Sequence, residues 1–399
     1  MRHLLMENHW KNTKEALLEG LGGNRRKVMD VCLENTRKDL LSRIPLTEAA
    51  TAGATAAGNV ATLNKVILPV IRRVMPTVIA NEIIGVQPMT GPVAQIHTLR
   101  VRYADTVPAA GGGTTAGQEA LGPFDIARFY SGNEEVANPR AAATAALEGR
   151  PGNRLSIQIL KETVEAKTRK LSARWTFEAA QDAQAQQGID IEAEIMAALA
   201  QEITAEIDQE ILTSLRALPS TSLTFDQGAV SGTATFVGDE HAALAVLINR
   251  QANLIAARTR RGAGNWVVVS PTALTILQSA TTSAFARTTE GVFEAPTNTK
   301  FVGVLNNSMR VYVDQYAADN TPVLVGYKGP GEIDAAAYYT PYVPLTSSGV
   351  VIDPQTFEPV VSFMTRYGYL ELSNTASSLG NAADYLGLIN IDTANLKFL

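Results

Sequence analysis

The feature that most constrains this fold is an uninterrupted helical pattern over residues 188–218. Asp190 is a favourable N-cap, and no Gly or Pro interrupts the pattern before Pro219. Apolar residues recur at every fourth position: Ile191, Ile195, Leu199, Ile203, Ile207, Ile211 and Leu215. Because a helical turn has 3.6 residues, this stripe drifts by about 40° per step and winds round the helix. The sequence therefore predicts one strut of roughly 28 residues and about 42 Å, with sheet packed along different sides of it.

Composition and charge exclude several classes of protein. A chain of 399 residues, 46% hydrophobic and 18% charged, can hold two or three globular domains. A net charge of -5 argues against a nucleic-acid-binding protein, because such proteins neutralise phosphates with an excess of Lys and Arg. Cys32 is the only cysteine, so we expect a reducing compartment, with neither a disulfide within the chain nor a cysteine-based zinc site. The N-terminus has no secretion signal, and Pro69 interrupts the best apolar run, so we expect neither export nor membrane insertion.

The N-terminal part changes character near Glu48. Residues 1–48 predict one or two short amphipathic helices, broken at Gly22–Gly23, that form a separate module. The basic cluster of Arg25, Arg26 and Lys27 is interpreted as a solvated helix start. From residue 49 the sequence becomes AATAGATAAGNVAT, whose small residues predict a linker or arm.

Two strands are predicted to project from the body. Residues 95–103 alternate polar and apolar side chains, and residues 154–177 resume as strand. Between them, residues 104–153 are poorly periodic and rich in Gly, Ala and Pro. An interval of this length predicts a functional excursion at the end of a two-strand projection.

A compact α+β unit is predicted after the long helix. Its expected parts are a turn-rich segment at 219–238, a helix capped by Asp239 and ended by Gly262, a strand at 266–269, a helix begun by Ser270–Pro271, a hairpin over 300–314 that turns at Asn306–Asn307–Ser308, and a strand at 323–327. A short helix at 178–187 precedes the long one, and further strands are predicted within 342–345, 360–367 and 385–391.

The sequence contains no convincing catalytic or metal-binding motif. His3, His9, His97 and His241 lie far apart and outside metal-binding motifs. Gly111–Gly113 lacks the lysine that follows the glycines of a phosphate-binding loop. Gly262–Gly264 precedes a strand, whereas the glycines of a dinucleotide-binding motif follow one. Arg258, Arg260 and Arg261 are interpreted as cations at a helix C-terminus. We therefore expect no catalytic, cofactor-binding or metal-binding residues.

Glu202, Glu206 and Glu210 form the sharpest enzyme-like pattern. Their spacing places three carboxylates on one helix face, as in dimetal carboxylate proteins. Those proteins also need E-x-x-H motifs, which this sequence lacks. A solvated or intersubunit face is the favoured interpretation, and a carboxylate-metal enzyme is the alternative from another class.

Long segments of the chain resemble a known family. They are VILPVIRRVMPTVIANEIIGVQPMTGPVAQIHTLRVRY (66–103), TVEAKTRKLSARWTFEAAQDAQAQQGIDIEAEIMAALAQEITAEIDQEIL (163–212), NWVVVSPT (265–272), and parts of 303–368 that include GVLNNSMRVYVDQYA and PVVSFMTRYG. In this order they resemble the major capsid protein of T-even-type tailed bacteriophages, which has the Hong Kong 97 type capsid fold. The resemblance implies an α+β subunit that self-assembles into hexameric capsomers of an icosahedral head around double-stranded DNA.

The resemblance implies a domain organisation. It comprises an N-terminal scaffolding-like propeptide (1–48), an N-terminal arm (49–75), a peripheral domain (76–103, 166–239 with the spine helix, and 341–399), an extended loop (104–165) and an axial domain (240–340). The implied partners are sister subunits, vertex and portal proteins, decoration proteins, and scaffold and prohead protease during assembly. The implied location is the virion, and the bacterial host cytoplasm during assembly.

The family's protease removes a propeptide after Leu/Ile-x-Glu. Leu46, Thr47 and Glu48, followed by Ala49, match this pattern where extended backbone is expected. The letters of Leu17–Leu18–Glu19 also match, but they lie within a predicted helix. The resemblance thus implies maturation cleavage between Glu48 and Ala49.

The sequence departs from relatives of this fold in two ways. The interval 104–153 is about 50 residues and rich in Gly, too short to predict a complete insertion domain. No lysine occurs between Lys65 and Lys161, so we expect no isopeptide crosslink from the loop tip. The alternatives within the fold are a pentameric vertex protein and an encapsulin-like compartment shell.

Overall fold

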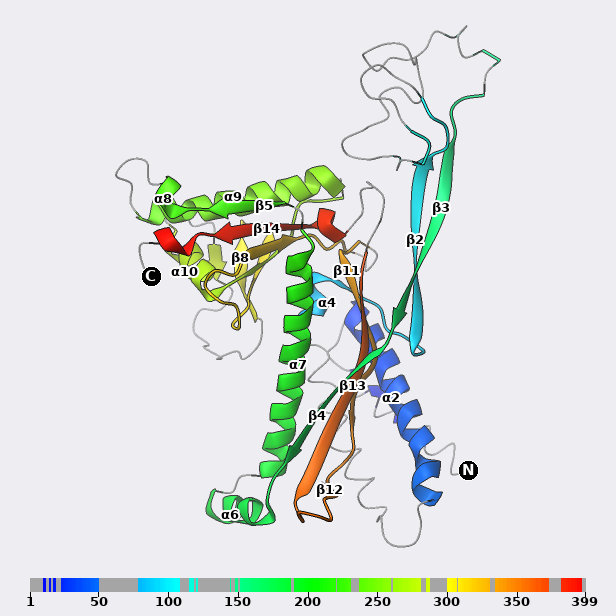
Figure 1. Ribbon diagram of the computed structural model, residues 1–399, viewed down its shortest axis with the longest axis vertical. Coiled ribbons are helices and arrows are strands. Elements are labelled where there is room, and N and C mark those ends of the chain that lie inside the picture. Colours follow the sequence, from blue (N-terminus) through cyan, green and yellow to red (C-terminus); the bar gives the residue numbers. More distant parts are fainter. Residues whose placement is uncertain are drawn as a thin grey trace.

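The computed structural model describes residues 10–11, 14–15, 17–18, 23–49, 78–107, 115–117, 120, 144, 148–149, 151–187, 190–219, 221–230, 237–259, 261–280, 285–287, 300–306, 308–330, 334–372 and 382–396. In chain order its elements are α2 (Gly23–Ala49), α4 (Ala80–Ile83), β1 (Gly85–Val86), β2 (Val93–Tyr103), β3 (Leu155–Glu165), β4 (Lys167–Arg174), α6 (Phe177–Gln187), α7 (Ile191–Ala217), β5 (Ser222–Phe225), α8 (Gln227–Val230), α9 (Val237–Thr259), β6 (Trp266–Val269), α10 (Pro271–Ser279), β7 (Phe285–Arg287), β8 (Lys300–Leu305), β9 (Met309–Val313), β10 (Val323–Gly326), β11 (Ala337–Ser347), β12 (Val351–Ile352), β13 (Pro359–Glu371), the 3-10 turn Ala382–Tyr385, β14 (Leu386–Ile391) and the 3-10 turn Thr393–Asn395. Figure 1 shows their arrangement. The predicted α+β class is confirmed.

The long helix α7 is confirmed and forms the axis of the lower part of the molecule (Figure 1). The side chain of Asp190 accepts a hydrogen bond from the Glu192 amide, as the N-cap prediction requires. Five of the seven residues of the predicted stripe, from Leu199 to Leu215, are buried, whereas Ile191 and Ile195 are half-buried. The covered side changes along the helix, because different elements pack against its two ends.

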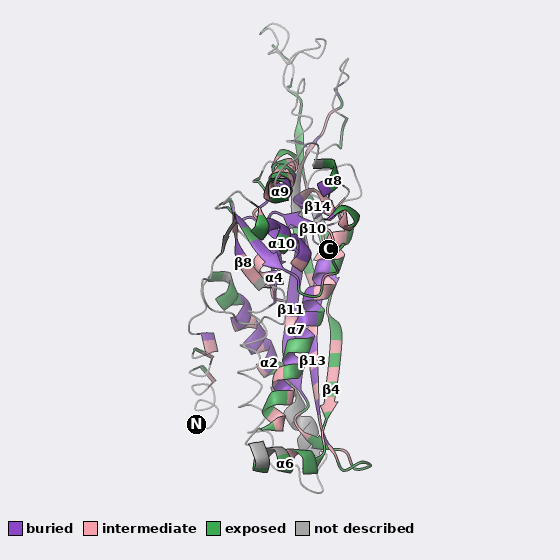
Figure 2. Ribbon diagram, turned by 90° about the vertical axis from the view of Figure 1, so that its left-hand side faces the viewer, coloured by how far each residue is buried: buried purple, intermediate pink, exposed green. Residues whose placement is uncertain are grey.

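One sheet lies beside α7, with strand order β1-β11-β13-β12 and with β4 paired to β13. β11 and β13 pair antiparallel, with irregular register after Pro341. β4 pairs antiparallel with β13 along its whole length, from Tyr367 opposite Lys167 to Val360 opposite Arg174. We call these five strands the peripheral sheet. Figure 2 shows buried residues running along β11 and α7, while α6 at the lower end is largely exposed.

A second sheet has strand order β5-β14-β10-β6-β9-β8-β7, and we call it the axial sheet. Helix α9 packs on β14, β10 and β5, and α10 packs on α9. Ser270 caps α10 by accepting from the Ala273 amide, and Asn306 takes a positive φ of 52° in the β8–β9 turn, as the sequence predicts. The strands β5 and β14 were predicted to belong to the peripheral domain. That prediction is wrong, because both pair within the axial sheet.

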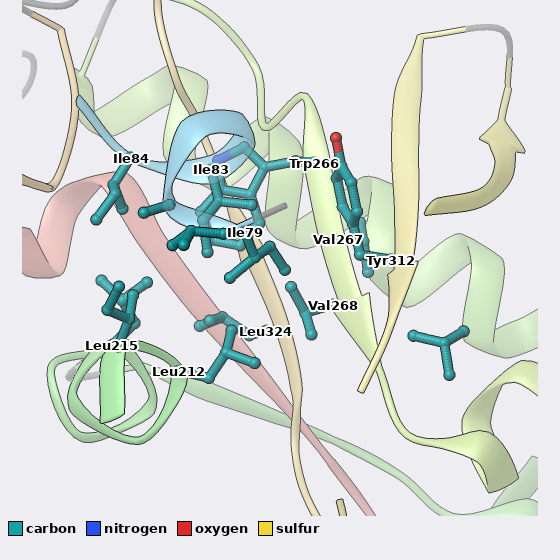
Figure 3. Close-up of a cluster of buried hydrophobic side chains, with 14 of the residues drawn as sticks. Ile79, Ile83, Ile84, Leu212, Leu215, Trp266, Val267, Val268, Tyr312 and Leu324 are labelled. Carbon is teal, nitrogen blue, oxygen red and sulfur yellow. The ribbon is translucent and has the colours of Figure 1, made fainter. Parts of the chain in front are cut away.

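The two sheets share one hydrophobic core. Figure 3 shows the junction, where Ile83 of α4 and Leu212 of α7 meet Trp266 of β6 and Leu324 of β10. Gly326 of β10 pairs in register with Trp266, and a Cβ atom on Gly326 would lie 2.1 Å from Cζ2 of the indole. Only a glycine leaves room for the ring at this place in the sheet.

The predicted two-strand projection is confirmed as the β2–β3 ribbon. β2 and β3 pair antiparallel in unbroken register from Val93 opposite Glu165 to Tyr103 opposite Leu155. The ribbon extends away from both sheets (Figure 1). At its base, Val164 packs with Ile96 and Tyr338, which fixes the ribbon on the peripheral sheet. Most of the predicted excursion beyond the ribbon lies outside the described residues.

Two predictions about helices are wrong. The N-terminal part does not form a separate module, because α2 is one helix of 27 residues and its Cys32 and Leu33 belong to the main core. Asp239 does not cap the next helix, because α9 begins at Val237 and Asp239 lies in its first turn. The start of α9 lies two residues before Asp239, which is within the usual uncertainty of a helix end.

Candidate functional site

Exposed apolar side chains gather at two places. Among the residues that the structure describes, eleven large hydrophobic side chains are exposed: Val93, Leu155, Ile157, Ile159, Phe177, Val237, Val246, Tyr316, Val351, Ile352 and Phe357. Four of them lie on the β2–β3 ribbon, and four lie where α6 meets the turn between β12 and β13. These two places are at opposite ends of the molecule in Figure 1. Contiguous exposed apolar surface of this kind marks interaction sites.

The ribbon carries an apolar row on one face. Leu155, Ile157 and Ile159 alternate along β3, so they point to the same side, and they are 55%, 68% and 65% exposed. Their register partners Tyr103, Val101 and Leu99 on β2 are also apolar. The neighbouring positions Ser156 and Arg102 face the other side. The distal half of the ribbon therefore has one apolar face and one polar face.

The lower end of the molecule carries a patch of Phe177, Val351, Ile352 and Phe357, which we call the tip patch. The two Phe rings lie 5.6 Å apart, centroid to centroid. Phe357 has a φ of 57° and is 70% exposed. A left-handed backbone is unfavourable for a bulky side chain, and here the amide of Phe357 donates to the Asp353 carbonyl at 2.8 Å and holds the turn. A strained turn thus presents an aromatic ring to the outside.

The carboxylates of Glu206 and Glu210 are engaged within the subunit. Arg169 of β4 donates to Glu206 at 2.7 Å, to Glu210 at 2.5 Å and to the Tyr367 hydroxyl of β13 at 2.6 Å. The Tyr367 hydroxyl also donates to Glu210, whereas Glu202 is exposed. Burial acts to raise the pKa of Glu210, but the hydrogen bonds from Tyr367 and Arg169 bring it below its ordinary value. The interpretation as a solvated face holds for Glu206, which is exposed although it pairs with Arg169, and is wrong for Glu210, which is half-buried. Through Arg169 of β4, both carboxylates tie α7 to the peripheral sheet.

A buried carboxyl that the sequence analysis did not single out lies further along α7. Asp208 is 1% exposed, and its Oδ1 accepts from the Ile79 amide at 2.9 Å. Burial raises the pKa of Asp208 to about 7, the hydrogen bond from Ile79 acts to lower it, and nearby Asp314 raises it. Asp314 is also buried, where it accepts from Gln209 at 2.6 Å and lies 3.0 Å from the Arg216 guanidinium. The two acids lie at the junction of α7 with the axial sheet.

We expect Asp208→Asn to remove part of the pH dependence of stability. The folded pKa of about 7 lies above the unfolded value of about 3.9, so the folded state binds more protons between these values and loses stability as pH rises through them. Asparagine cannot ionise, and its side-chain oxygen can still accept from Ile79. The variant should be more stable than the parent at pH 8, by on the order of a few kcal/mol, with no gain at pH 4. Urea unfolding at several pH values measures this, with exposed Glu202→Gln as control; equal pH slopes in variant and parent would contradict it.

The remaining candidates of the sequence analysis are scattered. His97 is exposed on β2, whereas His241 is buried and its Nδ1 lies within hydrogen-bonding distance of the Ser279 hydroxyl. Arg258 lies in the last turn of α9, and Arg261 forms an ion pair with Asp334. Within the described ranges no three His, Cys, Asp or Glu side chains gather as a metal site, and no helix there is long and apolar enough to cross a membrane. His3, His9, Gly111–Gly113, Arg260 and Asn307 lie outside the described residues.

The N-terminal candidates lie on α2. Arg25 forms an ion pair with Glu82, so the basic cluster is only partly a solvated helix start. Leu46, Thr47, Glu48 and Ala49 form the last turn of the helix, where the sequence analysis expected extended backbone.

Comparisons with known proteins bear on the whole chain. The family model of the major capsid protein Gp23 matches residues 60–391. The major capsid protein of Vibrio phage KVP40 is 30% identical, over 94% of this chain and 95% of its own length. That of Enterobacteria phage T4 is 29% identical, over 90% of this chain and 87% of its own length. A chain from Mycobacterium phage Bobi (TM-score 0.48, 13% identity, 79% of this chain and 90% of that one) and one from the capsid of Myoviridae phage XM1 (TM-score 0.42, 12% identity, 77% and 90%) are similar solved structures. The match to the family model covers most of the sequence, from before α4 to the end of β14, and this chain therefore belongs to the Gp23 family of major capsid proteins.

Proposed function

We propose that this protein is the major capsid subunit of a tailed bacteriophage and builds hexameric capsomers of an icosahedral head around double-stranded DNA. Membership of the Gp23 family supports the capsid role. The observation in the structure that best supports self-assembly is the apolar row on the β2–β3 ribbon, whose residues are 55–68% exposed and have no cover within the described part of the chain. A surface of this kind needs a partner, and a shell supplies sister copies.

We propose that the ribbon and the residues between its two strands form the extended loop, which lies over a neighbouring subunit. The sequence predicts this loop over residues 104–165 and β2 in the peripheral domain, whereas β2 pairs with β3 over its whole length. A head-to-tail contact between different surfaces of identical copies closes into a ring when the rotation between them permits it. Its apolar face would be buried on the neighbour, and its polar face, with Ser156 and Arg102, would stay in water. Removal of apolar area from water stabilises such a contact by about 25 cal/mol per Å². Many such contacts sum into a stable shell, although each one is weak.

The remaining assignments follow from the same role. The peripheral sheet with α7 would be the peripheral domain of a Hong Kong 97 type subunit, and the axial sheet its axial domain. The subunit acts by binding its neighbours, without an enzymatic reaction of its own, and a net charge of -5 suits a container whose wall does not bind the genome. Vertex, portal and decoration proteins, a scaffold and a prohead protease are the proposed partners, in the virion and in the host cytoplasm during assembly.

Electron microscopy of purified particles tests the proposed function. We expect closed icosahedral heads that contain DNA and carry this chain as the principal shell component. A copy number restricted to the vertices would assign the chain to the pentameric vertex protein, and cargo enzyme in place of DNA would assign it to an encapsulin-like compartment. A stable monomer that forms no particles would contradict the proposal.

We expect subunits from DNA-filled heads to have the mass of residues 49–399. The proposed cut follows Leu46–Thr47–Glu48, and a protease must draw extended backbone into its active site, so the last turn of α2 has to unwind first. Intact-mass spectrometry of the subunit from mature heads measures this, and subunits from empty precursor particles serve as the control. A full-length mass from filled heads would exclude the cleavage.

A further inference from the structure

The N-terminal helix α2 is built into the subunit that it would leave after cleavage. Val28 and Met29 are 2% exposed, and Cys32 and Leu33 are fully buried. These four side chains lie one helical turn apart on one face and join the main core. The helix therefore presents a continuous apolar stripe to the peripheral sheet, against which α7 also packs.

Tyr339 of β11 is buried in the core to which Cys32 and Leu33 of α2 also belong. Burial raises the pKa of Tyr339 well above its ordinary value, and the further contributions come from Cys32 of α2, Tyr367, and Asp208 and Glu210 of α7. A side chain of the sheet thus lies within electrostatic reach of both helices.

A polar contact fixes the register of α2 on the sheet. The side-chain amide of Asn35 donates to the Met89 carbonyl at 2.7 Å and to the Tyr342 carbonyl at 2.9 Å. Tyr342 lies at the irregularity of the β11–β13 ladder, between Pro341 and Val343, where no register partner is assigned to it. Asn35 is 6% exposed, so both of its amide hydrogens are used in a buried place. Loss of Asn35 would leave two backbone carbonyls without this donor.

An ion pair holds the N-terminal end of α2. Arg25 contacts Glu82 of α4, and Glu82 also accepts from Arg310 at 2.9 Å and from the Tyr312 hydroxyl at 3.2 Å. Arg310 and Tyr312 belong to β9 of the axial sheet. Glu82 thus links α2 to both parts of the subunit.

We propose that the peripheral sheet carries a docking groove for α2, and that the helix stays bound in this groove after the chain is cut behind Glu48. The occupant is this chain's own excised N-terminal peptide, held by the apolar stripe, by Asn35 and by Arg25. Hydrolysis of the peptide bond, by a protease and water, and departure of the peptide are then two separate steps. The peptide leaves only when the peripheral sheet that forms the groove changes its conformation. The natural cut rests on the proposed function, whereas the groove rests on the contacts alone.

An engineered cut in the full chain tests the groove. A recognition site for a sequence-specific protease is inserted after Ala50, in the segment rich in Ala and Gly, and the purified protein is cut in vitro. Cys32 is the only cysteine and is fully buried, so its reaction with a thiol reagent reports exposure of α2 at a single site. We expect the cut peptide to co-elute with residues 51–399 in gel filtration, and Cys32 to react as slowly as in the uncut protein.

A pair of variants isolates the contribution of Asn35. In the cut protein, Asn35→Ala should raise the rate of Cys32 labelling by about ten-fold or more, because two buried carbonyls lose their donor. Lys27→Ala, on the exposed side of the same helix, should leave the rate unchanged. The proposed docking of α2 would be contradicted if the peptide separated on cutting, or if Cys32 were labelled as fast as in urea-unfolded protein. Equal rates in the two variants would overturn the role of Asn35. Failure to form particles with the groove result intact would contradict only the proposed function.

Discussion

We expect a subunit that carries Ile157→Asp and Ile159→Asp to fold normally and to form no closed particles. Both side chains lie on the exposed face of β3, 68% and 65% exposed, so the change removes little packing within the subunit. In a shell the same face would be buried on a neighbour, and two unpaired carboxylates would be taken out of water. Each costs several kcal/mol, and the cost recurs at every contact around the capsomer. Negative-stain microscopy and sedimentation measure the particles, and circular dichroism measures the fold.

Ser156→Asp is the matched control for this prediction. It places one carboxylate, against two in the double variant, on the same strand but on the polar face of the ribbon, so particle formation should be retained. Assembly of the double variant into normal heads would show that the apolar face of β3 is not buried between subunits. Loss of assembly in both proteins would show that any added charge on β3 is disruptive, whichever face carries it.

Gly326→Ala is expected to destabilise the subunit by more than about 3 kcal/mol. A Cβ atom would lie 2.1 Å from Cζ2 of Trp266, and this ring is 2% exposed in the core, so it cannot swing out to water. The strands β10 and β6 would have to separate, or the indole would have to leave its place. Urea unfolding followed by Trp fluorescence measures the free energy of unfolding.

Gly152→Ala is the control, because a Cβ atom there would meet nothing within 4 Å. Its free energy of unfolding should match that of the parent within about 0.5 kcal/mol. A Gly326→Ala variant of parental stability would mean that the packing of Trp266 on β10 is looser than the structure shows.

An element could be predicted from the sequence where all the signals for it lie within its own residues. Helix α7 has a capping Asp190, an apolar repeat and a terminating Pro219, and it forms over residues 191–217 as predicted. The alternating pattern of residues 95–103 gave β2, and the turn chemistry of Asn306 gave the β8–β9 hairpin. In these segments, propensity, periodicity and turn residues agree with one another.

The contacts that join the elements of the subunit could not be predicted, because they connect residues far apart in the chain. Asn35 meets Tyr342 across 307 positions, and Arg169 meets Glu210 from a separate strand. Nothing in the local sequence says that Asp208 is buried, since its neighbours on α7 include ordinary solvated glutamates. The left-handed turn at Phe357 also contradicts the preference of a bulky residue. Tertiary packing sets the partner, the burial or the backbone conformation of each of these residues.

The position of β14 has a consequence for folding. This strand, residues 386–391, lies between β5 and β10 inside the axial sheet, parallel to the first and antiparallel to the second. Without β14 the ladder would divide into a lone β5 and the five strands from β10 to β7. The axial sheet is therefore complete only once segments far apart in the chain have met, which makes its closure slower than that of a sheet built from hairpins alone.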